Sequence, residues 1–376
     1  MTDFIRTAQS FKQGSRTLSR EYFTSPDIYA LEHERIFGRY WLCAGRAEQI
    51  EKPGQYVLLE LEHESLILTR DKDGIPHAFF NLCRHRGTKL CVEESGQLAQ
   101  SIQCPYHAWT YALDGLLIGA PHMDMVQDFD KADYSLHEAH LVEWEGFLFL
   151  NLHPDPQPFA EWFAPLIARL PKWGLADLRT ARKVVYDVAA NWKIIAQNYS
   201  ECYHCPLVHP DLAERTPYLG GMNDLTEGPF LGGYMNMNYP SLSISTNRVA
   251  DPLTGIGGSD LQRVYYYTVF PNALISPHPD YVMLHTLWPR GLRRTLVTCE
   301  WMFHPSAFDK PDFNPNDAAD FWDTVNRQDW EMCERAQLGV LSSRYSPSPY
   351  SGQESLLPAL DRNYLAALGH TPNVSI

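Results

Sequence analysis

Two short pairs of cysteine and histidine mark the first third of the chain. Cys83-x-His85 is followed, after 18 intervening residues, by Cys104-x-x-His107. Two thiolates and two imidazoles suit either a structural zinc ion or a [2Fe–2S] cluster with both cysteines on one iron and both histidines on the other. Zinc sites usually pair like ligands with like, whereas here each pair is mixed. The spacing therefore favours the cluster, with Cys83 and Cys104 on one iron and His85 and His107 on the other.

A second group of polar residues lies within Asn191–Pro210. Asn198, Glu201 and His204 follow one another at steps of three residues, which predicts that they lie close to one face of a helix. Pro206 should end or bend that helix, because it has no N–H to donate. A break after Cys205 would let the chain fold back, so that His204 and His209 could face one metal ion.

Two histidines and one carboxylate, with the remaining positions open, are the ligands of non-haem Fe(II) centres that react with oxygen. A long helix predicted over residues 319–341 carries three carboxylates that could complete such a set: Asp323, Asp329 and Glu331. The alternatives for the second site are a structural zinc ion or ordinary hydrogen-bonded polar residues.

The two motifs together resemble the catalytic α subunits of Rieske-type ring-hydroxylating oxygenases. In that family an acid-x-x-His-x4-His motif has an asparagine three residues before the acid, and an aspartate on a long C-terminal helix follows Gln or Glu. Gln328-Asp329 matches this last pattern. The resemblance implies a Rieske [2Fe–2S] cluster, a mononuclear Fe(II) held by His204, His209 and Asp329, and catalytic roles for Glu201 and Asn198.

Glu201 occupies a position where most ring-hydroxylating members have aspartate. In the family this acid links a cluster histidine of one subunit to an iron histidine of the next, which implies a path from the partner subunit's His107 through Glu201 to His204. Such a path requires a ring of subunits, typically a homotrimer. The glutamate and the surrounding ECYHC run resemble the branch that oxidises carnitine, glycine betaine, proline betaine and choline.

The resemblance implies a monooxygenase, with O2 as co-substrate and electrons from a separate NAD(P)H-dependent flavin or ferredoxin reductase. The expected reaction hydroxylates an N-methyl group of a quaternary ammonium compound and so removes it as formaldehyde. The alternatives are hydroxylation or O-demethylation of an aromatic acid and, from another class, an electron-transfer Rieske protein with a structural metal at the second site. Aromatic side chains should surround a quaternary ammonium; the candidates are Tyr203, Tyr234, Tyr239, Tyr265, Tyr267, Phe270 and Trp288.

Composition narrows the class of protein further. A net charge of −14 argues against binding to nucleic acids or to anionic membranes, and no run of about 18 apolar residues predicts a transmembrane helix. The start of the chain lacks the apolar stretch of a secretory signal. Eight cysteines are too sparse for a disulfide framework in this length, so those outside the cluster are expected to be reduced thiols in a cytoplasmic protein.

The pattern of strands, helices and turn residues along the chain predicts an α+β fold with two domains. Short strands bounded by turn residues predict an all-β Rieske domain over residues 41–153, with the two cluster loops at one end. Residues 154–376 are expected to form a helix-grip-like catalytic domain, an antiparallel sheet with helices, and residues 1–40 an N-terminal arm that packs on it. Within it we predict a mainly helical stretch over 162–178 that Pro165 and Pro171 interrupt, a strand over 182–188, and successive antiparallel strands over 264–270, 273–276, 282–288 and 295–303.

Overall fold

The computed structural model describes residues 4–370, and the chain divides into two compact units. The small unit is Gly38–Phe159. The large unit combines two separate stretches, Met1–Phe37 and Ala160–Ile376. The N-terminal arm therefore belongs to the same unit as residues 160–376.

The small unit consists of β-strands with short connecting turns. Its main sheet is antiparallel. Buried hydrophobic side chains of the unit form two core clusters. The strand order is β2 (Leu42–Arg46), β11 (Phe147–Asn151), β10 (Glu138–Trp144), β5 (Pro76–Phe80), β4 (Ser65–Arg70), β3 (Gln55–Glu60) and β6 (Ser95–Gln97). A separate three-stranded sheet contains β7 (Ser101–Gln103), β8 (Thr110–Ala112) and β9 (Leu117–Gly119).

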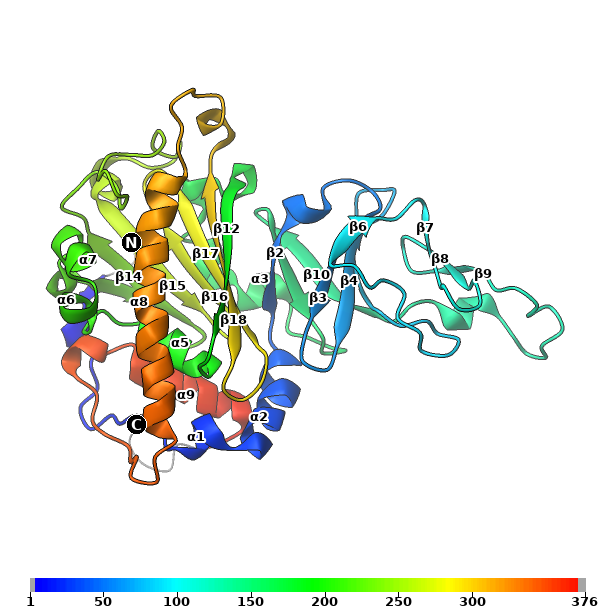
Figure 1. Cartoon of the computed structure of the whole chain (residues 1–376), viewed down its shortest axis with the longest axis horizontal. Coiled ribbons are helices and arrows are strands. Elements are labelled where there is room, and N and C mark those ends of the chain that lie inside the picture. Colours follow the sequence, from blue (N-terminus) through cyan, green and yellow to red (C-terminus); the bar gives the residue numbers. More distant parts are fainter. Residues whose placement is uncertain (1–3, 371–376) are drawn as a thin grey trace. The chain divides into compact units, whose positions relative to one another are not determined.

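One antiparallel sheet forms the centre of the large unit (Figure 1). The four strands from β15 (Arg263–Val269) to β18 (Thr295–Phe303) form a meander. The sequence predicts it, because apolar segments alternate with turns that contain Pro or Gly. The strand order is β1 (Ile5–Arg6), β13 (Met222–Leu225), β14 (Phe230–Asn236), β15 (Arg263–Val269), β16 (Ala273–Pro277), β17 (Val282–Pro289), β18 (Thr295–Phe303) and β12 (Arg179–Val188).

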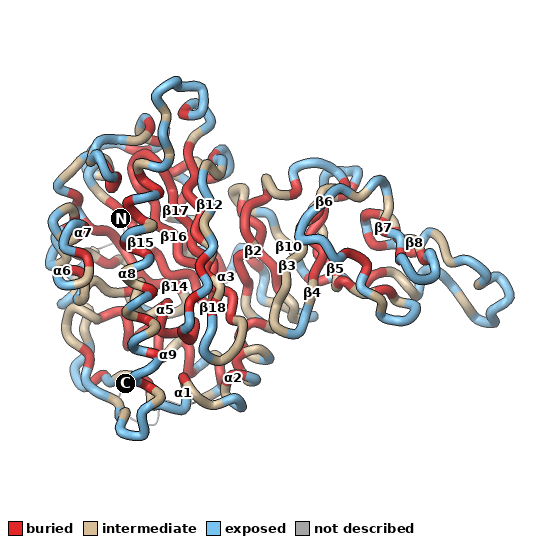
Figure 2. The backbone as a smooth tube through the Cα atoms, in the orientation of Figure 1, coloured by how far each residue is buried: buried red, intermediate tan, exposed pale blue. Residues whose placement is uncertain are grey.

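Helices lie on this sheet, and the longest, α8, runs across one face of it (Figure 1). The buried positions of α8 recur at steps of three and four residues, which is the pattern of a helix with one apolar face. Figure 2 shows the buried segments concentrated in the strands and on the inner side of α8. The helices are α1 (Glu21–Thr24), α2 (Pro26–Glu32), α3 (Phe159–Trp162), α4 (Ala164–Ile167), α5 (Trp192–Tyr199), α6 (Cys205–Val208), α7 (Pro210–Arg215), α8 (Asn316–Val340) and α9 (Leu357–Leu368).

A buried ion pair ties the N-terminal arm to the rest of the large unit. Lys193 Nζ of α5 lies 2.5 Å from Glu32 Oε1 of α2, and the two side chains are 2% and 1% exposed. The Glu32 carboxylate also accepts hydrogen bonds from Trp192 Nε1 at 2.8 Å and from Tyr364 Oη of α9 at 2.6 Å. Three helices from distant parts of the sequence therefore meet at one carboxylate.

The predicted α+β class, an all-β domain with a sheet-and-helix domain, is confirmed. The prediction of an interrupted, mainly helical stretch over residues 162–178 is confirmed: short helical turns follow one another, and Pro165 and Pro171 each stand in the first turn of a new one. Gly174 separates the last two turns in a left-handed conformation with φ +56°. Strands β1, β6, β10, β13 and β14 were not predicted.

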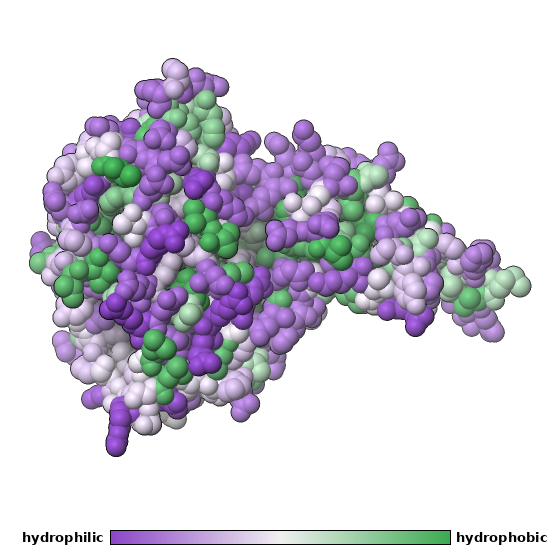
Figure 3. Space-filling view, viewed as in Figure 1, coloured by the Kyte–Doolittle hydropathy of each residue, from purple (hydrophilic) through white to green (hydrophobic). Residues whose placement is uncertain are grey.

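Within residues 4–370, no helix combines the length and apolar character needed to cross a membrane. The face of the large unit seen in Figure 3 is mainly hydrophilic, with separate hydrophobic patches.

Candidate metal centres

Cys83 and Cys104 lie in two loops of the small unit that share one backbone conformation. In each loop the cysteine carbonyl accepts a hydrogen bond from the residue four positions later, Gly87 N at 2.9 Å or Ala108 N at 3.1 Å. Each cysteine N–H is bonded to the carbonyl of the residue five positions later. Gly87 and Ala108 both have positive φ, +70° and +58°, which closes the turn. The two loops are thus matching turns despite their different spacing.

The four cluster residues divide by burial. Both cysteines are buried, whereas His85 and His107 are exposed, with their ring centroids 4.8 Å apart. The side chains of Cys83 and Cys104 also lie close enough to interact. A pair of buried sulfurs beside a pair of exposed imidazoles fits a [2Fe–2S] cluster with one sulfur-bound and one nitrogen-bound iron.

The hydroxyl group of Tyr111 contacts the loop that carries Cys83. Its hydroxyl accepts a hydrogen bond from Arg84 N at 3.0 Å, and lies 3.2 Å from Cys83 Sγ, to which it can donate. Burial raises the pKa of Tyr111, so the phenol keeps its proton. Hydrogen bonds to a ligand sulfur are among the features that set the potential of an iron–sulfur centre.

The second candidate centre begins where α5 ends. The predicted single helix through Asn198, Glu201 and His204 is wrong, because α5 ends at Tyr199 and Glu201 lies outside it. The Glu201 carboxylate instead accepts hydrogen bonds from the backbone N–H groups of Tyr203 and His204, which forms a tight turn.

The sequence predicted that Pro206 ends or bends the helix that carries His204, and this is wrong. Pro206 stands in the first turn of the short helix α6, where a residue without an N–H is tolerated. The chain therefore turns between Tyr199 and His204, whereas the predicted break came after Cys205. The short helix α6 then lies between His204 and His209 in the sequence.

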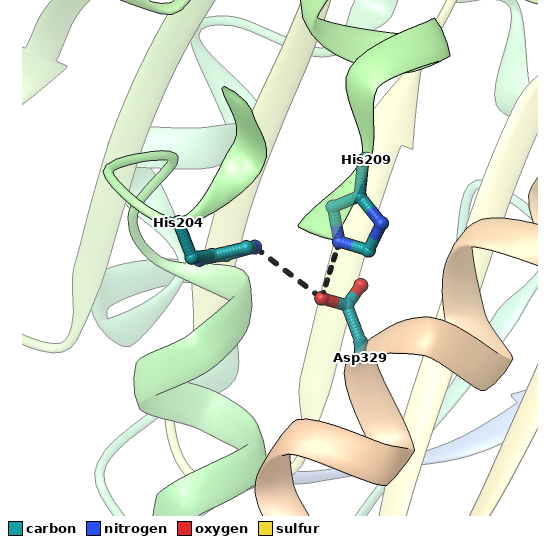
Figure 4. A group of neighbouring side chains, drawn as sticks. All are labelled: His204, His209 and Asp329. Carbon is teal, nitrogen blue, oxygen red and sulfur yellow. Dashed lines mark hydrogen bonds and ion pairs between the residues drawn. The ribbon is translucent and has the colours of Figure 1, made fainter. Parts of the chain in front are cut away.

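His204, His209 and Asp329 come together in the large unit (Figure 4). His204 Nε2 lies 3.3 Å and His209 Nε2 2.7 Å from the same oxygen, Asp329 Oδ1. All three donor atoms lie within 4.8 Å of one another, so one metal ion could contact them all. Ligands at about 2.1 Å and at right angles to each other are separated by about 3 Å, which the distances of 3.3 and 2.7 Å from the two histidines to Asp329 Oδ1 match.

The outer nitrogen of each histidine has its own acceptor. His204 Nδ1 lies 2.5 Å from Glu201 Oε1, and His209 Nδ1 lies 2.7 Å from Gln328 Oε1. With Nδ1–H donated to these oxygens, Nε2 of each ring would be available to bind a metal ion placed between the histidines and Asp329. The sequence indicated Gln328 only as context for Asp329, and its contact with His209 was not predicted.

The charges of the group favour a cation at its centre. Burial disfavours protonation of His204, but hydrogen bonds to Asp329 and Glu201 outweigh burial and raise the pKa of His204 to about 10. Burial acts to raise the pKa of Asp329, but hydrogen bonds from the two histidines outweigh it and lower that pKa. A proton shared among these ligands occupies the place where a bound metal ion would supply the positive charge.

The two other carboxylates considered for this site lie elsewhere. Asp323 accepts hydrogen bonds from Tyr186 Oη at 2.7 Å and from Arg327 Nε at 2.8 Å. Glu331 pairs with Arg335 on the exposed side of α8. Of the three candidates, α8 turns only Asp329 toward the two histidines.

A cavity of about 120 Å³ borders this group. Asn198 and Glu201 line it, as do five residues on one face of α8: Trp322, Val325, Asn326, Asp329 and Trp330. Strands β14, β15 and β17 form the opposite wall. The cavity is therefore a site where a small molecule can lie beside the candidate metal.

The predicted aromatic lining is wrong for six of the seven candidates. Only Tyr234 lines the cavity, and on β15 it is Tyr266 that does so, between Tyr265 and Tyr267. Neighbouring side chains of a strand point to opposite faces, so a run of three tyrosines could not show which one faces inward. The other aromatic lining residues are Tyr199, Tyr218, Trp322 and Trp330.

Cys202 and Cys205 form a disulfide, with their Cα atoms 5.0 Å apart. The expectation that all cysteines outside the cluster are reduced thiols is therefore wrong for this pair. The turn between α5 and α6 brings the two side chains together, which the sequence pattern did not reveal. The remaining cysteines are buried and form no disulfide among the described residues.

A matched pair of Cys/His loops in a β unit, and two histidines with a carboxylate beside a cavity in a sheet-and-helix unit, define the class of Rieske-type oxygenases. Two family models match the chain: the Rieske [2Fe-2S] domain over residues 40–130 and the ring hydroxylating alpha subunit (catalytic domain) over residues 175–370. The chain belongs to the family of ring-hydroxylating oxygenase α subunits. It is an oxygenase that carries a Rieske [2Fe–2S] cluster and a mononuclear iron and uses O2.

Individual relatives extend this similarity over most of the chain. The glycine betaine monooxygenase oxygenase subunit of Chromohalobacter salexigens is 30% identical over 90% of this chain and 83% of its own length. The carnitine monooxygenase oxygenase subunit of Acinetobacter baumannii is 36% identical over 53% of this chain and 54% of its own. A solved quaternary ammonium Rieske monooxygenase, described as acting in carnitine oxidation by gut microbiota, has a TM-score of 0.82 at 25% identity, covering 99% of this chain and 100% of that chain.

Proposed function

We propose that this oxygenase hydroxylates an N-methyl group of a quaternary ammonium compound. The observation that carries the proposal is the cavity beside Asp329, whose walls include the rings of Tyr266 and Trp322, with centroids 6.5 Å apart. A quaternary ammonium has no N–H to donate and is bound by aromatic faces within about 6 Å of its charge. Two of the relatives are oxygenase subunits of a glycine betaine and a carnitine monooxygenase, which agrees with this chemistry.

The residue roles follow from the contacts described above. Cys83 and Cys104 would hold one iron of the cluster and His85 and His107 the other, while His204, His209 and Asp329 would hold the mononuclear iron. Residues 41–153 would then form the Rieske domain, and residues 154–376, together with the arm 1–40, the catalytic domain. Gln328 and Glu201 accept hydrogen bonds from the Nδ1–H groups of the two histidines, which would keep Nε2 of each ring available to the metal. Asn198 lines the cavity next to Glu201 and would help to position the reacting molecule.

The reaction consumes one O2, two electrons and two protons for each hydroxylated methyl group. One oxygen atom enters the C–H bond as a hydroxyl group, and the other leaves as water. The bound iron supplies the activation of O2 and the cleavage of the C–H bond. The resulting carbinolamine loses its hydroxyl proton, its N–C bond breaks with the electron pair left on nitrogen, and formaldehyde and the demethylated amine separate. The protein orients the substrate and excludes water.

We further propose that the electrons come from a separate NAD(P)H-dependent flavin or ferredoxin reductase and cross between subunits of a homotrimer. The path would run from the partner subunit's His107 through Glu201 to His204. Glu201 Oε1 accepts one hydrogen bond from His204, and a carboxylate oxygen can accept a second. Tyr106 beside His107 is 56% exposed and Leu207 beside His204 is 90% exposed, as expected for surfaces that another subunit covers.

Single-turnover product analysis tests the reaction. Protein reduced in advance is mixed with O2 and, separately, with betaines and benzoate-type acids, and formaldehyde and hydroxylated products are measured. We expect formaldehyde from a quaternary ammonium compound. Asp329→Asn should abolish it, whereas Glu331→Gln, which changes an exposed carboxylate on the same helix, should not. Hydroxylation of an aromatic acid with no formaldehyde from any betaine would refute the proposal.

Co-expression of two inactive variants tests the path between subunits. His107→Ala disables the cluster site of one chain, and Asp329→Ala disables the iron site of the other. Mixed assemblies should regain activity, because an intact cluster in one subunit can serve an intact iron site in the next. If the two chains purify together and remain inactive, electrons do not cross between subunits.

A further inference from the structure

Trp330 connects the cavity to a tyrosine on the edge strand of the large sheet. It follows Asp329 on α8 and lines the same cavity. The ring centroids of Trp330 and Tyr186 are 5.8 Å apart at an angle of 61°. Tryptophan and tyrosine are among the side chains that lose an electron most readily, and rings this close exchange an electron rapidly. An electron can therefore pass from Tyr186 on β12 to Trp330 at the cavity.

Tyr186 has a base for the proton that its oxidation releases. Burial raises the pKa of Tyr186, so the phenol is protonated at rest. An oxidised phenol is a strong acid, and Tyr186 Oη already donates to Asp323 Oδ1 at 2.7 Å. The Asp323 side chain is 29% exposed, so it can pass the proton on to water. Trp330 Nε1–H has no acceptor within residues 4–370, so this tryptophan can relay an electron without releasing a proton.

A second pair of tyrosines also begins at the cavity. Tyr234 lines it, and the Tyr234 centroid lies 5.6 Å from that of Tyr265, whose hydroxyl donates to Asp260 at 2.6 Å. Cations contact both rings: the guanidinium carbon of Arg263 is 3.9 Å from the Tyr234 centroid, and Lys172 Nζ is 4.6 Å from the Tyr265 centroid. A positive charge beside a ring opposes the loss of an electron from it.

The cation beside Tyr186 opposes oxidation less. The guanidinium carbon of Arg327 is 5.5 Å from the Tyr186 centroid, and the Arg327 side chain is 64% exposed, where water and salt screen its charge. Of the two tyrosines that donate to a carboxylate near this cavity, Tyr186 is therefore the more easily oxidised.

We propose that Trp330 and Tyr186 carry an oxidising equivalent away from the iron site when O2 is activated and no substrate reacts. The inference rests on the proposed iron ligands and not on the proposed substrate. Trp330 gives one electron to the oxidised site, and Tyr186 gives one electron to Trp330 and its phenolic proton to Asp323. A soluble thiol then returns an electron and a proton to Tyr186, Asp323 releases its proton to water, and two thiols oxidised in this way join as a disulfide. The path protects the cavity side chains from oxidation.

Freeze-quench EPR spectroscopy tests the path in iron(II)-loaded protein with its cluster oxidised, mixed with hydrogen peroxide and no substrate. Reduction of peroxide to two waters takes two protons and two electrons, one electron from iron(II) and the other, with one proton, from Tyr186. We expect a tyrosyl radical signal that Tyr186→Phe abolishes. Tyr265→Phe is the matched control, because it removes another hydroxyl that donates to a carboxylate, and it should keep the signal. No tyrosyl signal in the unmodified protein, or one that survives Tyr186→Phe, would overturn the inference and leave the proposed function standing.

Two carboxylate variants separate the base from the iron site. Asp323→Asn keeps an acceptor oxygen for the Tyr186 hydroxyl, but an amide cannot take its proton, so the signal should fall several-fold. An unchanged signal would overturn the role of Asp323. Asp329→Asn should abolish the signal, because the oxidant no longer forms beside Trp330. A tyrosyl signal that persists in Asp329→Asn would overturn the proposed iron ligands together with this inference.

Peptide mass spectrometry after peroxide treatment measures the protection itself. Met283 lines the cavity and is 1% exposed, whereas Met125 is 95% exposed and meets peroxide directly from solution. Tyr186→Phe should raise methionine sulfoxide at Met283 several-fold and leave it unchanged at Met125. Equal oxidation of Met283 in the variant and the unmodified protein would overturn the protective function.

Discussion

Replacement of Glu32 by glutamine should destabilise the large unit severely. Glu32 is the carboxylate that pairs with Lys193 Nζ, at 2.5 Å, and both side chains are almost fully buried. Removing one partner of a buried ion pair leaves an uncompensated charge and costs about 3–5 kcal/mol. The glutamine Nε2 group also cannot accept the hydrogen bond that Trp192 Nε1 donates to Glu32 Oε2 at 2.8 Å.

Urea unfolding of the iron-loaded protein, followed by circular dichroism, measures this loss as a lower midpoint concentration. In thermal unfolding the Tm should fall by on the order of 10 °C. In the variant the unpaired Lys193 has a pKa lowered by burial, so between that pKa and the unfolded value near 10.5 the unfolded state binds more protons. The stability of the variant should therefore rise with pH over that window, as the buried lysine releases its proton.

Two further variants decide whether the loss arises from the unpaired charge. Lys193→Met combined with Glu32→Gln removes both charges and should recover most of the stability. Glu34→Gln changes an exposed glutamate of the same arm and should alter stability by less than about 0.5 kcal/mol. A loss below about 1 kcal/mol for Glu32→Gln, or no recovery in the double variant, would refute the reasoning.

Three other predictions concern the iron site, the sheet and the pH dependence of stability. Gln328→Leu removes the acceptor for His209 Nδ1 and should weaken iron binding about 10- to 100-fold in a metal titration. Gly233→Ala would bring a Cβ to 1.9 Å from Met222 O, so it should separate β13 from β14 and lower the urea midpoint. Burial raises the pKa of Asp361 to about 7, so the folded state holds this proton more tightly than the unfolded state. Stability should therefore fall as pH rises from about 4 to about 7, by up to about 4 kcal/mol, and Asp361→Asn should remove this slope.

Each of these has a matched comparison. Gln328→Glu keeps an acceptor oxygen near His209 and should retain iron affinity, so an equal loss in both variants would contradict the role of the hydrogen bond. Gly220→Ala meets no atom within 4 Å of the new Cβ and should leave the protein as stable as before. If Asp361→Asn kept the full pH slope of the unmodified protein, the slope would arise from another group.

The sequence predicted which residues belong to the metal sites better than it predicted the backbone conformation around them. The mixed Cys/His spacing around Cys83 favoured a cluster by itself, whereas His204 was assigned to an iron only by the resemblance to the oxygenase family. The turn after Tyr199 was missed because Glu201 closes it with its side chain, and a step of three residues looks the same in a helix and in such a turn. Long-range pairings, such as His209 with Gln328, depend on how α8 lies on the sheet.

The sequence also did not show which face of a strand points toward the cavity. Tyr265, Tyr266 and Tyr267 are chemically alike, and only the register of β15 against β14 and β16 decides which of them reaches the cavity. The meander itself was predictable, because each of its strands is a continuous apolar run between turn residues.

The two-part construction of the large unit has a consequence for its synthesis on the ribosome. The arm that carries Glu32 is translated first, but Lys193 follows 161 residues later and Tyr364 332 residues later. At about 5–20 residues per second, the arm waits for tens of seconds before its last contact exists. The small unit, which is continuous in sequence, can fold during this delay. A nascent chain halted before α9 should therefore hold a finished cluster domain beside an arm that chaperones can still bind.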